Sequence, residues 1–343
     1  MAWEFHQPTR ILFGAGEAKR LAQLLEEYQI RRPALVCGKS QRKTWIAEAL
    51  NDCWAGVFSD IQPNPTTQNA RECAAFLRES RADGVVALGG GSVLDCAKVA
   101  AEVLPLLALP TTAGTGSEVT NIAVLTGEGG KQPAAKPEYY PLVALVDPAL
   151  TFTCPPQVTA ESGMDALAHA LEAMWSKQHT DLCDALACKA AQLIFTGIEA
   201  AYQNGAALSA RAAMSEGALL AGMAFSQTKT AAVHACSFPL TQRYGLSHGA
   251  ACAFTLAAFA RINADARLHK LAKLLGFADF FALAVEIERL QKALELPQTL
   301  IDAGIPAAEL PLLSAESLRF ANMQNNPAAM DEAKLLAMFR ALA

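Results

Sequence analysis

The sequence lacks the long apolar run that a membrane-spanning helix needs. Such a helix takes about 18 to 20 apolar residues without interruption. The nearest candidate, VAAEVLPLLALP at 99–110, is broken by Glu102, Pro105 and Pro110. The start, MAWEFHQPTR, has no basic region followed by an apolar core. We therefore expect neither a secretory signal nor a membrane partner.

An excess of charge and a cysteine framework are also missing. Charged residues make up 18% of the chain and the net charge is −5, which argues against nucleic acid as the main partner. Nine cysteines are present, mostly in apolar surroundings and without a CxxC pair. This pattern is typical of reduced, buried thiols, so we expect a cytoplasmic protein without disulfides or a structural zinc knot.

The remaining composition predicts a well-packed protein of about two domains, since 343 residues are 52% hydrophobic. Up to about residue 155, short apolar runs alternate with helical patterns. This alternation predicts a Rossmann-like parallel sheet with helices on both faces, in a dinucleotide-binding α/β domain at 1–157. We expect strands within 32–38, 57–61, 84–92, 105–114 and 141–148, and helices at 41–53, 67–81 and 93–104.

Segments rich in Ala and Leu follow the proline pair Pro155–Pro156, which is the natural boundary. They predict an all-helical domain at 158–343, with the cleft between the two domains as the expected site. The fold class is therefore α/β plus all-α. We expect helices at 160–176, 180–203, 208–227, 249–263, 266–275, 279–295, 315–322 and 330–342.

Two loops of the first domain have the composition of a nucleotide site. In ALGGGSVLDCAK, three glycines and Ser92 separate a strand from a helix, where backbone N–H groups can bind phosphate. A plain tight turn with a serine N-cap is the alternative. The second loop, LPTTAGTGSEVT at 109–120, offers a polar, uncharged cradle. Two such loops at the carboxyl ends of parallel strands favour a dinucleotide.

The first predicted strand, at 32–38, ends in CGKSQRKT, with Gly38, Lys39 and Ser40 where NAD-binding proteins usually place a carboxylate. No acid there repels a 2′-phosphate, and nearby cations can pair with it. We therefore predict NADP(H) in preference to NAD(H). Arg42 and Lys43 fit either this role or the solvated face of the next helix.

The second domain contains candidate metal ligands. GMDALAHALEA places Asp165 and His169 one helical turn apart inside an apolar helix. This pair alone fits a buried hydrogen bond as well as half of a metal site. His234 and His248 lie in similarly apolar surroundings. One carboxylate and three imidazoles suit a divalent ion such as Fe²⁺ or Zn²⁺.

The ordered motifs GGGSVLDCAK, LPTTAGTGSEVT, ALVDPAL, SGMDALAHALEA and HxxxxPL…YGLSHG resemble the iron-containing (group III) alcohol dehydrogenase family. The similarity runs from FGAGEAKRL to about residue 256, and beyond it the chain matches only in being helical. The resemblance implies a dehydroquinate synthase-like architecture, with Asp165, His169, His234 and His248 as metal ligands. It also implies cofactor contacts at Gly38, Gly90, Gly91, Ser92, Asp95, Thr111, Thr112, Ser117, Val119, Lys131 and Leu150.

The resemblance implies two further features. Gly38 replaces an Asp of NAD-preferring members, which supports NADP(H). Phe238 stands where several members carry an additional histidine of a proton path. Any proton relay must then use water, cofactor hydroxyls or other groups. A plain packing role for Phe238 is the alternative.

Together these features predict a metal-dependent NAD(P)H oxidoreductase that interconverts a small aldehyde and its primary alcohol. Because dimers are common among members of the family, the resemblance also implies a homodimer. A small anionic aldehyde such as phosphonoacetaldehyde is an alternative substrate, which Arg243 could bind if it entered the cleft. A position of Arg243 on the surface is equally compatible with the sequence. A dehydroquinate synthase-like lyase is less favoured because the second half shows no strongly basic phosphate pocket. Intact cofactor loops argue against a non-catalytic binding module.

Overall fold

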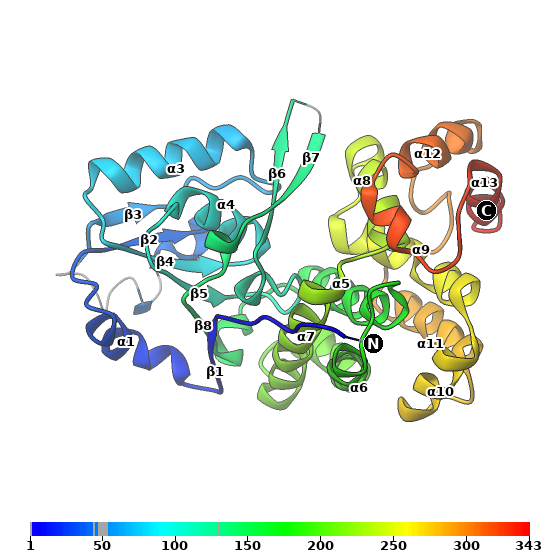
Figure 1. Ribbon diagram of the computed structural model, residues 1–343, viewed down its shortest axis with the longest axis horizontal. Helices are drawn as coiled ribbons and strands as arrows, with labels where there is room; N and C mark the ends of the chain where they lie inside the picture. Colours follow the sequence, from blue (N-terminus) through cyan, green and yellow to red (C-terminus); the bar gives the residue numbers. More distant parts are fainter. Residues whose placement is uncertain (1, 44, 47–53, 129) are drawn as a thin grey trace. The chain divides into compact units, whose positions relative to one another are not determined.

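The computed structural model describes residues 2–43, 45–46, 54–128 and 130–343. It forms two compact units, His6–Cys154 and Pro155–Ala343, the second of which includes the first residues of the chain. The first unit is α/β and the second is helical (Figure 1). Among the described residues, no helix has both the length and the apolar character needed to span a membrane.

The α/β unit is built on a parallel sheet of six strands in the order β1-β8-β5-β4-β2-β3, which confirms the predicted class. The central strands are buried on both faces, which explains their continuous apolar runs. The first strand of the chain was not predicted. The strands are β1 (Arg10–Phe13), β2 (Pro33–Cys37), β3 (Gly56–Phe58), β4 (Gly84–Gly89), β5 (Leu106–Pro110) and β8 (Val143–Val146).

Helices cover both faces of this sheet. α1 (Leu21–Glu27) packs on one face, and α3 (Thr67–Glu79) and α4 (Gly91–Ala101) pack on the other (Figure 1). An antiparallel hairpin, β6 (Ile122–Gly127) and β7 (Gly130–Ala135), follows the second loop and was not predicted. The helix expected at 41–53 falls largely outside the described residues, before which 39–43 form a 3₁₀ turn.

The helical unit is organised around its first long helix, in which every residue from Gly163 to Trp175 is buried. Helices α6, α7 and α9 pack against this α5. The helices of the unit are α5 (Pro156–Trp175), α6 (Asp181–Gln203), α7 (Leu208–Thr228), α8 (Ala232–Tyr244), α9 (His248–Asn263), α10 (Ala266–Leu274), α11 (Phe280–Ala293), α12 (Leu310–Ser317) and α13 (Glu332–Arg340).

Two helices differ from the prediction. Helix α8 was not expected, and it contains Pro239, which lacks the N–H for an intrahelical hydrogen bond. The helix predicted at 315–322 was placed too late in the chain. It begins at Leu310, because Pro311 in the first turn is pre-organised for a helix start.

Candidate metal centre and nucleotide loops

Three helices of the second unit bring a set of metal-binding side chains together. Donor atoms of Asp165 on α5, His234 on α8, and His248 and Cys252 on α9 all lie within 4.8 Å of one another. Asp165 Oδ1 lies 3.5 Å from His234 Nε2 and 3.7 Å from His248 Nε2. His169 lies beside this group, with Nδ1 3.9 Å from the same oxygen. The four residues predicted as ligands are therefore neighbours, and Cys252 joins them.

The donor atoms are spaced as ligands of a shared cation would be. Two donors bound about 2.1 Å from one ion at a tetrahedral angle lie about 3.4 Å apart, beyond a good direct hydrogen bond. Asp165 Oδ1 and His234 Nε2 are buried, and neither has a hydrogen-bond partner among the described residues. Such atoms are rare in folded proteins. The residues therefore fit a divalent metal ion.

The electrostatics of the cluster favour an ionised carboxylate. Burial raises the pKa of Asp165, but the nearby imidazoles of His169, His248 and His234 together lower it more, so the net shift is downward. An ionised Asp165 offers the negative charge that a divalent cation needs.

Gly249 explains how His248 reaches α5. A Cβ at Gly249 would lie 2.0 Å from the carbonyl oxygen of Glu161, one helical turn before Asp165. Only glycine therefore allows the start of α9 to contact the α5 backbone. The Ser247 side chain caps this start by accepting a hydrogen bond from the N–H of Ala250 at 3.3 Å.

Glu172 orients one of the imidazoles and was missed by the sequence analysis. Its carboxylate is fully buried, with Oε2 2.6 Å from His234 Nδ1. Oε1 accepts a hydrogen bond from the backbone N–H of Val233 at 2.7 Å. A proton on Nδ1 leaves Nε2 as the metal-binding nitrogen, facing Asp165. The available signal was spacing, since Glu172 lies two helical turns after Asp165 on the same face.

Aromatic side chains pack around the imidazoles. The Phe225 ring stacks on His169 with the ring centroids 4.1 Å apart. Phe238 is buried, with its ring centroid 6.2 Å from that of His248 and 4.6 Å from that of Phe320. Phe238 therefore forms an apolar wall beside His248.

Arg243 is engaged by carboxylates. Its guanidinium lies 3.1 Å from Glu309 and 3.3 Å from Glu316, on the segment leading into and through α12. Tyr244 also donates a hydrogen bond to Glu309 at 2.9 Å. These contacts tie α8 to α12 and engage Arg243 with carboxylates of the protein itself.

In the α/β unit, the two predicted nucleotide loops touch each other. A Cβ at Gly90 would lie 3.1 Å from Thr112 Oγ1, and one at Gly91 would lie 2.6 Å from Thr115 Cγ2. The glycines thus permit this close approach. Helix α4 begins at Gly91, with Ser92 in its first turn, and the first N–H groups of a helix are suited to bind an anion.

Asp95 and Lys98 hold the second loop from α4. Asp95 accepts hydrogen bonds from Ser117 Oγ at 2.6 Å and from the N–H of Val124 at 2.9 Å. The buried Lys98 Nζ donates to Thr120 Oγ1 at 3.1 Å and to the carbonyl of Ile122 at 2.9 Å. Both side chains therefore position the loop.

The other predicted cofactor residues occupy several elements of this unit. Thr111 donates its N–H to the Gly89 carbonyl at 3.0 Å, next to the first loop. Val119 is buried and accepts a hydrogen bond from Gln7 at 2.9 Å. Lys131 lies on β7, and Leu150 packs in the 3₁₀ turn after β8.

The buried Lys98 makes the free energy of unfolding depend on pH. Burial lowers the pKa of Lys98 to about 8, despite opposing effects of Asp95 and Glu118. Because the pKa in the unfolded chain is higher, the unfolded state binds more protons between pH 8 and pH 10, so stability from this group rises with pH there.

We expect Lys98→Met to remove this rise of stability with pH. Between pH 8 and pH 10 the free energy of unfolding of the wild type should gain up to about 1.4 kcal/mol per pH unit relative to the variant. Urea unfolding of both proteins across this range measures the difference. Parallel pH profiles would contradict the prediction.

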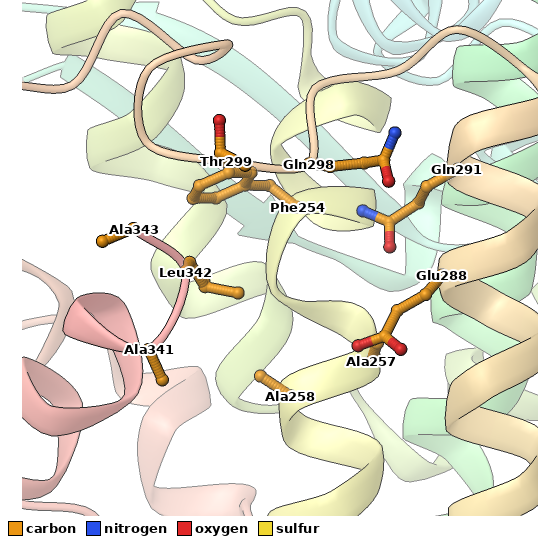
Figure 2. A pocket seen from close by; sticks show the side chains of 10 residues that line it. All are labelled: Phe254, Ala257, Ala258, Glu288, Gln291, Gln298, Thr299, Ala341, Leu342 and Ala343. Atoms are coloured by element: carbon orange, nitrogen blue, oxygen red, sulfur yellow. The ribbon is translucent and has the colours of Figure 1, made fainter.

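A separate cavity of about 320 Å³ lies between α9 and α11 (Figure 2). Two of its polar lining side chains are already used within the protein. Glu288 pairs with Arg261 at 2.7 Å, and Gln291 donates to the Ala253 carbonyl at 2.8 Å. No predicted site residue lines this cavity. It is therefore distinct from the metal-binding cluster.

Comparisons with known proteins agree with this site. Residues 8–148 match the family model described as iron-containing alcohol dehydrogenase, and residues 159–343 match the C-terminal part of the Fe-containing alcohol dehydrogenase family. The likeness thus extends well beyond residue 256, where the recognisable motifs end.

Individual relatives cover nearly the whole chain. A 1-propanol dehydrogenase of Salmonella typhimurium is 35% identical over 355 aligned positions, covering 94% of this chain and 95% of its own. The structure of sulfoacetaldehyde reductase from Bifidobacterium kashiwanohense with NAD⁺ has 37% identity and a TM-score of 0.96, covering 100% of this chain and 99% of its own. A 1,3-propanediol oxidoreductase structure has 30% identity and a TM-score of 0.93, with complete coverage of both chains.

A parallel α/β unit with paired nucleotide loops, joined in one chain to a helical unit with a buried donor cluster, defines a metal- and nicotinamide-dependent oxidoreductase. The chain belongs to the iron-containing alcohol dehydrogenase family. It acts on CH–OH groups and interconverts a small aldehyde and its alcohol.

Proposed function

We propose that the chain reduces a small aldehyde with NADPH, using Asp165, His169, His234 and His248 to hold the metal. The observation that carries this assignment is the buried oxygen of Asp165, which lies 3.5 to 3.9 Å from three imidazole nitrogens and has no hydrogen-bond partner among the described residues. A bound Fe²⁺ or Zn²⁺ supplies a Lewis acid that polarises the substrate carbonyl.

The other residues of the proposed site bind and position. The first turn of α4, at Gly91 and Ser92, binds the pyrophosphate through its N–H groups. The second loop, held by Asp95, lines the nicotinamide half. The Phe238 ring beside His248 cannot transfer a proton, so the proton that completes the alcohol comes from water, from a cofactor hydroxyl or from another group.

We propose NADP(H) as the preferred cofactor. Lys39 Nζ forms an ion pair with Asp60 at 2.9 Å, and both side chains are about three-quarters exposed. Exposed ion pairs contribute little free energy, so Lys39 can exchange Asp60 for a 2′-phosphate. The related sulfoacetaldehyde reductase was crystallised with NAD⁺. Kinetic discrimination between the two cofactors is therefore the informative measurement.

We expect Lys39→Ala to lower kcat/KM for NADPH about tenfold, because a charge-assisted hydrogen bond contributes about 1.5 kcal/mol. The value for NADH should change little, since NADH lacks the 2′-phosphate. Initial rates with both cofactors at one aldehyde concentration series give the ratio. An equal loss with both cofactors, or a wild type that prefers NADH, would refute the NADP(H) proposal.

For the substrate, we propose an aldehyde of a few carbons, with a small anionic aldehyde as the second candidate. Relatives named for 1-propanol and 1,3-propanediol support the first choice. The likeness to a sulfoacetaldehyde reductase supports the second. An NADPH-oxidation screen that compares butanal, phosphonoacetaldehyde and sulfoacetaldehyde separates them.

Within the second candidate, Lys229 is the cation we propose in place of Arg243. It directly follows α7, whose Phe225 stacks on His169. Lys229 is half-buried, its ammonium donates to the Ser226 carbonyl at 2.8 Å, and burial lowers its pKa. Burial disfavours the charged form of the Lys229 ammonium, and a substrate anion bound beside it would stabilise that charge.

We expect Lys229→Met to raise KM for sulfoacetaldehyde about tenfold, the effect of losing one ion pair worth about 1.5 kcal/mol. KM for butanal should change far less. Steady-state kinetics with both aldehydes tests this, and Arg243→Met serves as the matched control. A larger effect of the Arg243 substitution on sulfoacetaldehyde would reverse the assignment.

The homodimer and the cytoplasmic location stay predictions from the sequence. Size-exclusion chromatography with light scattering tests the first of them.

A further inference from the structure

Cys252 stands among the donor atoms of the metal-binding cluster. It lies on α9 one helical turn after His248, so both side chains occupy the same face of that helix. Its side chain is fully buried. Neither the recognisable motifs nor the ligand set that the family resemblance implies includes this position.

The distances around Cys252 are those of a ligand. Its Sγ lies 4.0 Å from His248 Nε2, and within 4.8 Å of the donor atoms of Asp165 and His234. A sulfur bound at about 2.3 Å and a nitrogen bound at about 2.05 Å lie about 3.6 Å apart at a tetrahedral angle. The observed 4.0 Å corresponds to an angle of about 134° at the ion, which is clearly wider than tetrahedral.

The surroundings of this thiol also differ from those of an ordinary buried cysteine. The thiol faces the buried Asp165 Oδ1 and His234 Nε2, neither of which has a hydrogen-bond partner among the described residues. Of the eight cysteines that the structure describes, no other belongs to such a group of donors. Cys252 thus forms a tight set of one oxygen, two nitrogens and one sulfur, and His169 beside this set makes Cys252 the fifth donor of the proposed site.

We propose that Cys252 coordinates the metal ion of this site through Sγ. On binding, the thiol proton passes to solvent and the sulfur donates an electron pair to the cation, with no change in oxidation state. The inference rests on the proposed metal centre but not on its catalytic use. Because thiolates are soft ligands, the site should select Zn²⁺ over Fe²⁺ more strongly than an oxygen and nitrogen site does.

Cobalt substitution tests this proposal without measuring activity. The full-length protein is stripped with a chelator and titrated with Co²⁺ under anaerobic conditions. Absorption spectra then report a thiolate-to-cobalt charge-transfer band in the near ultraviolet, which oxygen and nitrogen ligands do not give. Cys252→Ala and Cys252→Ser are compared with the wild type, and Cys188→Ala is the control for loss of a buried thiol elsewhere in the helical unit.

The wild type and Cys188→Ala should show the band at one equivalent of Co²⁺. The two Cys252 variants should lose it and bind Co²⁺ at least about tenfold more weakly. If both variants fail to fold, the presence or absence of the charge-transfer band in the wild type alone tests the thiolate ligand. One bound Co²⁺ without the band, or an unchanged band in Cys252→Ala, overturns the thiolate ligand and leaves the metal centre intact. A wild type that binds no Co²⁺ overturns both.

Discussion

Replacing His248 with alanine is expected to weaken metal binding and aldehyde reduction together. The imidazole lies 3.7 Å from Asp165 Oδ1, so its loss removes a donor from the cluster. Lewis-acid activation contributes several kcal/mol to transition-state stabilisation, so kcat/KM should fall by about 10³-fold. Metal analysis of anaerobically purified protein and NADPH oxidation with butanal measure the two losses.

A matched control distinguishes this effect from general damage to the helical unit. His179→Ala removes an imidazole that lies 3.3 Å from Asp184, away from the cluster. This variant should keep its metal and most of its activity. If His248→Ala turned over aldehyde at the wild-type rate without bound metal, the metal centre would have no role in the reaction.

The second large effect is expected at Glu172. In Glu172→Gln the amide oxygen can still accept from His234 Nδ1, but the negative charge is lost. Substitutions of this kind behind a metal-binding histidine weaken metal affinity about 10- to 100-fold. Glu172→Ala should also destabilise the fold by about 1 to 3 kcal/mol, because the N–H groups of His234 and Val233 lose their acceptor.

Metal affinity separates a positioning role from a merely structural one. It is measured by competition with a chromophoric chelator, at a temperature where circular dichroism shows each variant to be folded. Glu288→Gln, which alters an exposed ion pair with Arg261, is the control. Unchanged metal affinity in folded Glu172→Gln would show that Glu172 serves the fold alone.

The sequence was sufficient for the features that depend on local patterns. Continuous apolar runs predicted the buried parallel strands, because a strand covered on both faces carries no polar alternation. Asp165 and His169 were recognisable because polar residues one turn apart share a face of an apolar helix. The edge strand β1, short and partly exposed, gave a weaker signal and was missed.

Contacts between segments that are distant in the sequence could not be predicted from local patterns. Gly249 contacts Glu161 because two helices cross there, and no periodicity reports a crossing. Asp60 likewise reaches Lys39 because β2 and β3 are parallel neighbours whose carboxyl ends meet at one edge. Asp60 follows β3 and not β2, so the sequence at the end of β2 gave no sign of this acid.

Arg243 illustrates the same difficulty for charged side chains. A basic residue between two ligand histidines suggested a substrate anion, yet its partners Glu309 and Glu316 lie far along the chain. Helix α12, from which Glu316 comes, was itself predicted at the wrong position. The role of a charge thus depends on packing that a single segment does not encode.

The metal-binding side chains come from three separate helices. This arrangement affects how long the folded protein survives. An ion held by α5, α8 and α9 acts as a tie between segments that are far apart in the chain, so its binding free energy is also folding free energy. Starvation for the metal would then expose the helical unit to proteases. Enzyme abundance would fall along with enzyme activity.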